Sequence, residues 1–366
     1  MRILLTADAV GGVWQYATDL ARALGGREVE TVIALLGPPP SAVQRAEAAA
    51  IPGARLVETG LPLDWLSDGP APILAAGAAI AELAGDEHVD LVQLNMPSLG
   101  AAAPPPVPVL AVAHGCVSTW WQATCSGEPL PREFHWHRSL TGEGLRAAHA
   151  VAAPSAGYAR MVARLYGLPR VPAVVHNGRA FAPMANGAMQ DCVFTAGRLW
   201  DRAKNAALLD RVAARLAVPF HAAGPIAGPH GEAADLRHLH LLGSLDATGM
   251  ARQLACRPVF VSAARFEPFG LAVLEAAAAG SALVLSDMPV FRELWDGAAL
   301  FVAGEDEAGW TRAIESVIGD ADRRHRLGAA ARERAARYTA DAMAEAMLRL
   351  YARLLAHHPA GRRVAA

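Results

Sequence analysis

Two successive series of alternating strands and helices constrain the fold of this chain more than any other feature of its sequence. The first series opens with an apolar strand at residues 2–6, which a helix follows at about residues 13–24. The second opens near residue 191, after a stretch at residues 177–191 that is rich in Gly, Asn, Pro and Ala and is typical of a linker. Strands that alternate with helices favour parallel sheets covered on both faces. The sequence therefore predicts an α/β protein with two Rossmann-like, doubly wound parallel-sheet domains.

The length of the chain agrees with two domains and a terminal helix. At 366 residues it is too long for one ordinary α/β domain. We predict an N-terminal domain at residues 1–178 and a C-terminal domain at residues 179–338. The remaining segment, residues 339–366, begins with a helix whose apolar residues recur at helical spacing.

The composition disfavours several classes of protein. Hydrophobic residues make up 53% of the chain and its net charge is −2, so we expect neither intrinsic disorder nor binding to nucleic acid. We expect no membrane-spanning segment, and the N-terminus is typical of a buried first strand rather than a signal peptide. The four cysteines lack the CxxC spacing of a zinc site, and their scatter favours a reducing, cytoplasmic location.

The segment EPFGLAVLE at residues 267–275 is the strongest chemical feature. A helix is predicted at about residues 270–280, and Pro268 lies where a helix can begin, since proline suits the first helical turn. We expect the free N–H groups of residues 269–271 to form a phosphate site. Glu267 and Glu275 lie on either side of that site, and carboxylates accept hydrogen bonds from sugar hydroxyls. The implied ligand has hydroxyls on both sides of a phosphate, as a nucleotide-sugar does. The alternative is that both carboxylates are ordinary helix charges.

A second feature, GRLWDRAKN at residues 197–205, follows the first strand of the second series. Ligands of open α/β sheets bind at the carboxyl ends of the strands, and this segment lies at such an end. Arg198 and Lys204 could together neutralise a diphosphate. Lys204 is also the one lysine of the chain, whose other 32 basic residues are arginines. A salt bridge at the strand end and a lysine at a helix start are the structural alternative.

Two weaker features follow strands of the first series. Gly11 and Gly12 come after the first strand and would let the backbone approach a ligand, although the fingerprint G-x-G-x-x-G of dinucleotide turns is missing. His114 ends the apolar strand at residues 107–114. A glycine pair is often only a tight turn and a lone histidine is usually structural. Both features nevertheless lie at carboxyl ends of strands, where ligands bind.

Together these four features resemble the retaining GT-B glycosyltransferases, the large group that includes sucrose synthases, bacterial glycogen synthases and phosphatidylinositol mannosyltransferases. EPFGLAVLE matches the Glu-x7-Glu motif of that group, and GRL…KN matches its diphosphate-binding pair. The resemblance implies the GT-B architecture, in which two Rossmann-like domains face a cleft. It covers nearly the whole chain and is most specific in the second domain.

The resemblance also implies a role for each matching residue. The implied catalytic residues are His114, Arg198, Lys204 and Glu267. The implied donor-binding residues are Gly11, Gly12, Phe269, Gly270, Leu271 and Glu275. Within these sets, Glu267 would contact the donor hexose, Glu275 the nucleotide ribose, and His114 would lie near the anomeric carbon.

The reaction that the resemblance implies is transfer of a hexosyl group from a nucleotide-diphosphate sugar with retention of configuration. In this group the leaving diphosphate is thought to take the proton of the acceptor hydroxyl, so that no protein nucleophile is required. Arg198, Lys204 and the helix N-terminus would stabilise the charge on the diphosphate, as a metal does elsewhere. We therefore expect no metal site and no cofactor.

The segment at residues 114–138 holds the candidate acceptor-binding residues, Trp120, Trp121 and Trp136. Aromatic faces stack on sugar rings, an exposed aromatic cluster can dip into a membrane, and a packed lid over the sheet is the third interpretation. Residues 1–176 hold 11 arginines, no lysine and 15 acidic residues, so the basic surplus that docks proteins on anionic lipid is missing. We expect a saccharide, lipid or small-molecule acceptor and at most weak peripheral membrane contact.

Other functions stay open. A sugar-nucleotide epimerase or a phosphorylase of the same architecture would use the same donor motifs. A non-catalytic nucleotide-sugar-binding protein would keep the pocket without turnover. A nicotinamide-dependent dehydrogenase fits the sheets, but the missing glycine fingerprint counts against it.

Overall fold

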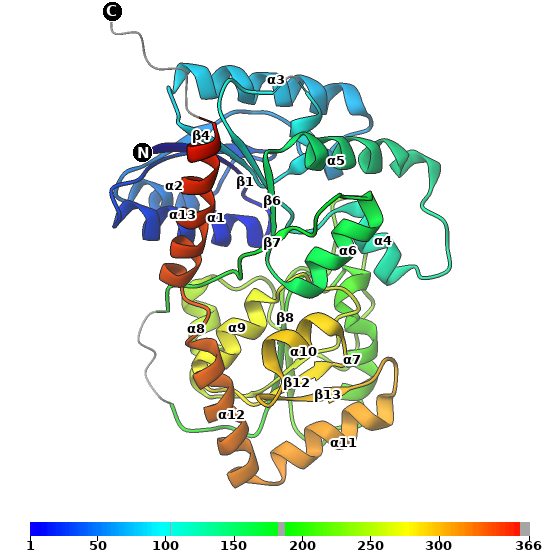
Figure 1. Cartoon of the computed structure of the whole chain (residues 1–366). Helices are drawn as coiled ribbons and strands as arrows, with labels where there is room; N and C mark the ends of the chain where they lie inside the picture. The colour runs from blue at the N-terminus through cyan, green and yellow to red at the C-terminus, as the bar shows by residue number, and fades with distance from the viewer. Residues whose placement is uncertain (103, 182–186, 359–366) are drawn as a thin grey trace, which may run out of the picture. The chain divides into compact units, whose positions relative to one another are not determined.

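The computed structural model describes residues 1–102, 104–181 and 187–358, which form two compact units (Figure 1). The first unit comprises Met1–Ala180 and the chain from Ala340 onward, and the second comprises Phe181–Thr339. Part of the predicted linker, residues 182–186, and the end of the terminal segment, residues 359–366, lie outside the described residues. Each unit is built around a parallel sheet, which confirms the predicted α/β fold with two Rossmann-like domains.

The sheet of the first unit has the strand order β3-β2-β1-β4-β5-β6-β7, and all of its pairs are parallel. Ile3 and Leu5 of the central strand β1 belong to one core cluster and Leu4 to another, so the strand is buried on both faces and reads as an unbroken apolar run. The strands are β1 (Arg2–Asp8), β2 (Glu30–Leu36), β3 (Ala54–Glu58), β4 (Leu91–Leu94), β5 (Val109–Val112), β6 (Ala150–Ala153) and β7 (Ala173–Val174).

The helices of the first unit cover this sheet, and the last helix of the chain is one of them. Met343, Met347 and Tyr351 of that helix, α13, share a core cluster with Trp14 and Leu20 of α1. The helices are α1 (Gly12–Gly25), α2 (Ala42–Ala49), α3 (Pro70–Asp86), α4 (Val117–Thr124), α5 (His135–Ala147), α6 (Ala156–Tyr166) and α13 (Ala340–His357), with 3-10 turns η1 (Asp64–Leu66), η2 (Pro97–Ala101) and η3 (Arg132–Phe134).

The sheet of the second unit has the strand order β10-β9-β8-β11-β12-β13, again with parallel pairs. Its strands are β8 (Val193–Ala196), β9 (Phe220–Ala223), β10 (His240–Leu241), β11 (Val259–Ser262), β12 (Leu283–Ser286) and β13 (Ala299–Val302). Its helices are α7 (Ala206–Ala213), α8 (Ala247–Ala255), α9 (Leu271–Ala279), α10 (Pro289–Trp295), α11 (Glu307–Ile318) and α12 (Ala321–Ala335), with the 3-10 turn η4 (Arg202–Lys204).

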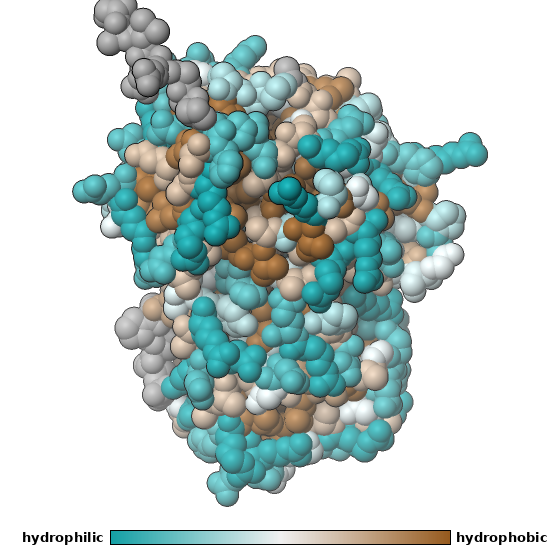
Figure 2. All heavy atoms as spheres, viewed as in Figure 1, coloured by the Kyte–Doolittle hydropathy of each residue, from teal (hydrophilic) through white to brown (hydrophobic). Residues whose placement is uncertain are grey.

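The surface mixes hydrophobic and hydrophilic residues. On the face shown in Figure 2, hydrophobic residues reach the surface in small areas between hydrophilic ones. Among the described residues, no helix combines the length and the apolar character that crossing a membrane requires.

Candidate active site

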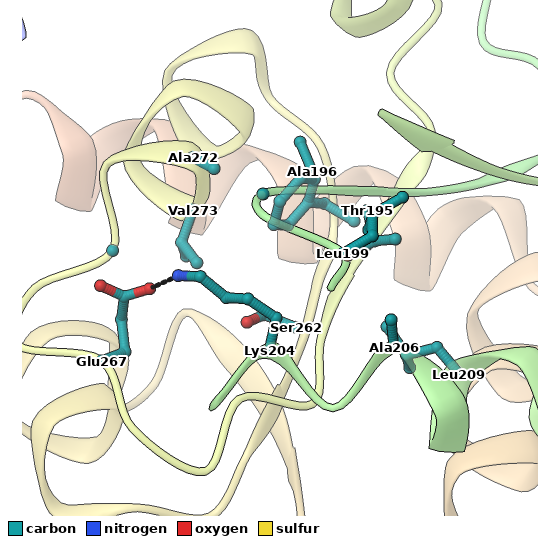
Figure 3. A pocket seen from close by; sticks show the side chains of 13 residues that line it. Thr195, Ala196, Leu199, Lys204, Ala206, Leu209, Ser262, Glu267, Ala272 and Val273 are labelled. Atoms are coloured by element: carbon teal, nitrogen blue, oxygen red, sulfur yellow. Dashed lines mark hydrogen bonds and ion pairs between the residues drawn. The ribbon is translucent and has the colours of Figure 1, made fainter. Parts of the chain in front are cut away.

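A pocket opens in the second unit at the carboxyl ends of β8 and β11 (Figure 3). Its walls come from the end of β8 with the turn after it, the start of α7, and the segment that joins β11 to α9. Carboxyl ends of strands are where doubly wound sheets bind ligands. Lys204, Glu267 and Gly270, three of the residues predicted from the sequence, line this pocket together.

Lys204 and Glu267 form an ion pair in the pocket. The Lys204 Nζ donates to Glu267 Oε2 at 2.5 Å, and the two side chains are 25% and 16% exposed. Figure 3 shows the lysine side chain extending past Val273 toward the carboxylate. Attraction between charges is stronger in such a partly buried site than in open water. Each charge therefore neutralises the other.

The backbone of Lys204 is fixed by Asp201, which the sequence analysis missed. The Asp201 side chain is 3% exposed and accepts a hydrogen bond from the N–H of Ala203 at 2.9 Å. The Asp201 carbonyl accepts from the N–H of Lys204 at 2.8 Å. An aspartate at the start of a helical turn is a normal cap, and this signal could have identified it.

The segments that carry Lys204 and Glu267 are bonded to each other. The N–H of Arg265 donates to the carbonyl of Ala203 at 2.8 Å. The carboxylate of Glu305 accepts from Asn205 at 2.9 Å and from Arg265 at 2.8 Å. Lys204 and Glu267 are therefore held at a defined separation by residues of the second unit itself.

Helix α9 begins at Leu271, in agreement with the helix predicted at about residues 270–280, but Pro268 does not lie in its first turn. Gly270 has a φ of +96°, in the left-handed region, and this conformation cannot continue a right-handed helix backward into Phe269. Gly270 is instead the N-cap, and its carbonyl accepts the first intrahelical bond, from the N–H of Leu274 at 3.0 Å. Proline is tolerated in the first helical turn but does not require one, so Pro268 can precede the helix.

The free N–H groups at the start of α9 follow from this boundary. The N–H groups without an intrahelical acceptor are those of residues 270–273, and Gly270 and Leu271, two of the three predicted amides, are among them. Ala272 and Val273 line the pocket, so this turn faces it. The Phe269 side chain is buried at 2% exposure. A helix N-terminus beside a lysine favours an anionic ligand.

Glu275 and Arg198 lie outside the lining of this pocket. Glu275 follows the first turn of α9 and is half-buried. Arg198 is 46% exposed, and its guanidinium pairs with Asp201 at 2.8 Å and lies 5.6 Å from the centre of the Trp200 ring. Asp201 thus pairs with the Arg198 guanidinium and fixes the backbone of Lys204, but only the Lys204 side chain reaches into the pocket.

In the first unit, Gly11 lies in the short turn after β1, and Gly12 is the first residue of α1. The Asp8 Oδ1 accepts from the N–H groups of Val10 at 2.9 Å and Gly11 at 3.1 Å. Gly11 is the N-cap of α1, and a Cβ added to it would meet nothing within 4 Å. The structure therefore leaves space at the first turn of α1, as the sequence analysis expected for a ligand-approaching loop.

His114 lies at the carboxyl edge of the same sheet, two residues beyond β5. Its Nε2 is 3.0 Å from Asn95 Oδ1, and its ring packs edge-on against Tyr16 with ring centres 4.3 Å apart. Burial lowers the pKa of His114 to about 3, so the imidazole is neutral at physiological pH. Asn95, which the sequence analysis missed, directly follows β4 and could have been found by the same strand-end rule.

The three candidate acceptor-binding tryptophans belong to one aromatic cluster on α4 and α5. The ring centres of Trp120 and Trp121 are 6.2 Å apart, and Trp136 stacks on His137 at 3.7 Å. The Phe134 ring connects the Trp120–Trp121 pair to the Trp136–His137 pair. Its centre lies 6.2 Å from the Trp121 ring centre and 5.9 Å from the His137 ring centre. Trp136 also packs against the core of the unit, while Trp120 and Trp121 are half-buried.

In the part of the chain that the structure describes, no three His, Cys, Asp or Glu side chains are grouped so that they could hold a metal ion. The four cysteines are free thiols.

The left-handed conformation of Gly270 gives a testable expectation. The Gly270→Ala variant should destabilise the second unit by about 1–3 kcal/mol, because its new Cβ would adopt φ +96° and lie 3.2 Å from the Phe291 ring. Urea-induced unfolding measures the loss. Gly243→Ala is the control, since Gly243 has a φ of +67° and open space around it. Equal losses in the two variants would contradict a tight fit at Gly270.

Two protein-family models match the chain in succession. The model of Glycosyltransferase Family 4 matches residues 10–179, and the model of Glycosyl transferases group 1 matches residues 190–320. The first range contains His114 and the Gly11–Gly12 loop, and the second contains Lys204 and Glu267.

Curated proteins resemble short parts of the sequence, and solved structures resemble nearly the whole fold. D-inositol 3-phosphate glycosyltransferase of Stackebrandtia nassauensis is 38% identical over 87 residues, which are 23% of this chain and 20% of that relative. The chain thus matches about a fifth of the length of this curated relative. Sucrose-phosphate synthase from Thermosynechococcus elongatus has a TM-score of 0.78 at 18% identity, covering 98% of this chain and 100% of that one. Anabaena HepE in complex with UDP-glucose has a TM-score of 0.74 at 16% identity, covering 97% and 100%.

Proposed function

Because the chain belongs to the GT-B glycosyltransferases, with a family 4 domain followed by a group 1 domain, we propose that it transfers a hexosyl group from a nucleotide-diphosphate sugar to a hydroxyl of an acceptor. The transfer retains the anomeric configuration and uses no metal ion. The observation that carries this proposal is the ion pair of Lys204 and Glu267 beside the first turn of α9. A cation and a helix N-terminus suit a diphosphate, and a carboxylate suits sugar hydroxyls.

The donor occupies the pocket of the second unit. The ammonium of Lys204 and the N–H groups of residues 271–273 bind the diphosphate, and its charge replaces that of Glu267 as the partner of Lys204. Glu267 is then released to accept hydrogen bonds from the hexose hydroxyls. Glu275, farther along α9, binds the ribose hydroxyls. The complex of HepE with UDP-glucose supports a nucleotide sugar as the donor.

Catalysis is electrostatic. As the bond from the hexose to the diphosphate breaks, negative charge grows on the diphosphate, and Lys204 and the end of α9 are already positioned to stabilise it. The proton of the acceptor hydroxyl passes to an oxygen of the leaving diphosphate, so no protein nucleophile is needed. Arg198 contributes by exchanging Asp201 for a phosphate oxygen, which its 46% exposure leaves room to do.

Gly11, Gly12 and His114 of the first unit keep the donor-binding roles that the family resemblance implies. The space beside Gly11 at the start of α1 suits the approach of a phosphate. His114 supports the donor sugar near its anomeric carbon, and it does so as a neutral ring because burial lowers its pKa to about 3.

The acceptor is a saccharide, a lipid or a small molecule. The half-buried rings of Trp120 and Trp121 are the proposed surface for it, since aromatic faces stack on sugar rings. The acidic surplus of residues 1–176 supports weak membrane contact at most, and the protein acts in the cytoplasm.

Calorimetric titration with GDP, UDP and ADP, each with and without EDTA, tests the donor site. One nucleotide should bind with micromolar affinity that EDTA leaves unchanged. The sugars of that nucleotide are then tested as donors, and NMR of the product identifies its anomeric configuration. Binding of none of the three would contradict the donor site. Affinity lost on adding EDTA would contradict metal independence, and an inverted product would contradict retention.

A further inference from the structure

His114 rests on a set of buried polar side chains that its proposed role does not explain. Asn95 is 7% exposed, and Gln93 and Thr6 are fully buried. Buried polar groups are costly unless each finds a hydrogen-bond partner. Apolar side chains beneath His114 would avoid this cost, so the presence of three buried polar side chains needs an explanation.

The orientation of the Asn95 amide is fixed by its neighbours. Its Nδ2 donates to the carbonyl of Thr6 at 2.6 Å, and a carbonyl can only accept. Its backbone N–H donates to Thr6 Oγ1 at 2.9 Å. Its Oδ1 accepts from Gln93 Nε2 at 2.9 Å and also faces His114 Nε2 at 3.0 Å. The atom that Asn95 presents to His114 is therefore an acceptor.

The orientation of Gln93 is fixed in turn from two helices. Its Nε2 donates to Tyr16 Oη of α1 at 3.1 Å as well as to Asn95, so both of its hydrogens are used. Its Oε1 accepts from Tyr351 Oη of α13 at 2.5 Å. The hydrogen bonds thus run without a gap from the terminal helix to His114.

An acceptor opposite Nε2 determines where the imidazole carries its hydrogen. Nε2 must donate, and in a neutral ring Nδ1 then has a free lone pair. Burial alone lowers the pKa of His114, and the facing titratable group is Tyr16, whose pKa burial raises, so no charged neighbour disturbs this state. Within the described residues, the bond to Asn95 is the one hydrogen bond of the ring, and His114 is half-buried rather than buried.

We propose that Asn95 is a positioning residue that fixes the Nε2–H tautomer of His114, so that Nδ1 is presented to the ligand as a hydrogen-bond acceptor. Such a nitrogen binds a hydroxyl, which can donate, and disfavours an ionised phosphate oxygen, which can only accept. His114 therefore selects a hydroxyl of the sugar at this point and not the diphosphate. The inference rests on the proposed function for the identity of the ligand, but the tautomer itself does not depend on it.

NMR of the protein with nitrogen-labelled histidine tests the tautomer without any substrate. His114→Asn identifies the signals by their loss. In the unaltered protein, Nε2 should carry the hydrogen and the ring should not titrate between about pH 5 and 8. In Asn95→Leu, which has a similar size and no acceptor, the hydrogen should distribute over both nitrogens. An Nδ1–H tautomer in the unaltered protein, or an unchanged tautomer in Asn95→Leu, would overturn the proposal.

The Asn95→Asp variant adds a kinetic readout. A carboxylate beside the ring favours the imidazolium and raises the pKa of His114, so the ring becomes charged as the pH falls through that raised value. Nδ1 is then a donor and cannot accept from the sugar. We expect kcat to fall about 10- to 100-fold on the acid side and to recover partly as the pH rises. If Asn95→Asp instead lowers kcat by the same factor at every pH, the role of Asn95 is purely structural.

Ser98→Ala is the matched control. Ser98 is fully buried in the same segment after β4, and its hydroxyl donates to Asp64 at 2.7 Å without touching His114. This variant should lose stability while the tautomer and the pH profile stay unchanged. If the chain transfers no sugar at all, the proposed function fails while the NMR result still decides the role of Asn95.

Discussion

The Lys204→Ala variant is expected to transfer hexose about 10²- to 10³-fold more slowly in kcat, a loss of about 3–4 kcal/mol of transition-state stabilisation. Lys204 is the one cationic side chain among the residues lining the donor pocket. Its charge matters most when the diphosphate departs, so kcat should fall more than donor affinity. The variant also leaves Glu267 without its partner at 2.5 Å, and that carboxylate then repels the phosphate. Initial rates at saturating donor and calorimetric titration with the nucleotide separate the two effects.

Arg202→Ala is the matched control for Lys204→Ala. Arg202 belongs to the same 3-10 turn and carries the same charge, but it is exposed and lies outside the pocket lining. Its removal should leave kcat within about twofold, because exposed charges are screened by water and salt. Equal losses in both variants would mean that Lys204 acts through the general positive charge of the turn and not by contact with the diphosphate.

The sequence predicted both sheets because their central strands are buried on both faces. Strands such as β5 and β11 are unbroken apolar runs, and such runs bounded by turns are a strong signal. The edge strand β3 was missed, since its residues are half-buried or exposed and carry no such run. Helix α10 was missed because seven residues make only two turns, too few for a helical period to be evident.

The sequence brought Lys204, Glu267 and Gly270 forward as site candidates, and the structure places all three in the lining of one pocket, but their interactions could not be predicted. The strand-end rule places Lys204 and Glu267 at the same edge of a sheet, although 62 residues separate them in the sequence. It does not say that they pair with each other, or that Arg198 turns instead to Asp201. Those outcomes depend on side-chain directions that follow from the left-handed Gly270 and the capped turn at Asp201. Backbone conformations of this kind leave only weak traces in a single sequence.

The largest loss of stability is expected from Gly224→Ala. Gly224 follows β9 with a φ of +134°, and a Cβ built on it would lie 1.7 Å from the carbonyl oxygen of Gly197. The two strand ends are also bonded, since the N–H of Gly197 donates to Ala223 at 3.0 Å. The clash is with backbone and cannot be relieved by a rotamer change, so we expect about 3–5 kcal/mol of destabilisation of the second unit. Urea-induced unfolding followed by circular dichroism measures it.

Gly231→Ala separates the clash from backbone strain, because Gly231 also has a positive φ, +87°, but no atom within 4 Å of its added Cβ. It should cost about 1–2 kcal/mol, the strain alone. Gly197 lines the donor pocket, so Gly224→Ala should also weaken nucleotide binding under conditions where the variant is still folded, whereas Gly231→Ala should not. Similar stability of the two variants would mean that β8 and β9 can separate at their carboxyl ends. In that case, close packing of the strand ends does not fix the position of Gly197 in the pocket lining.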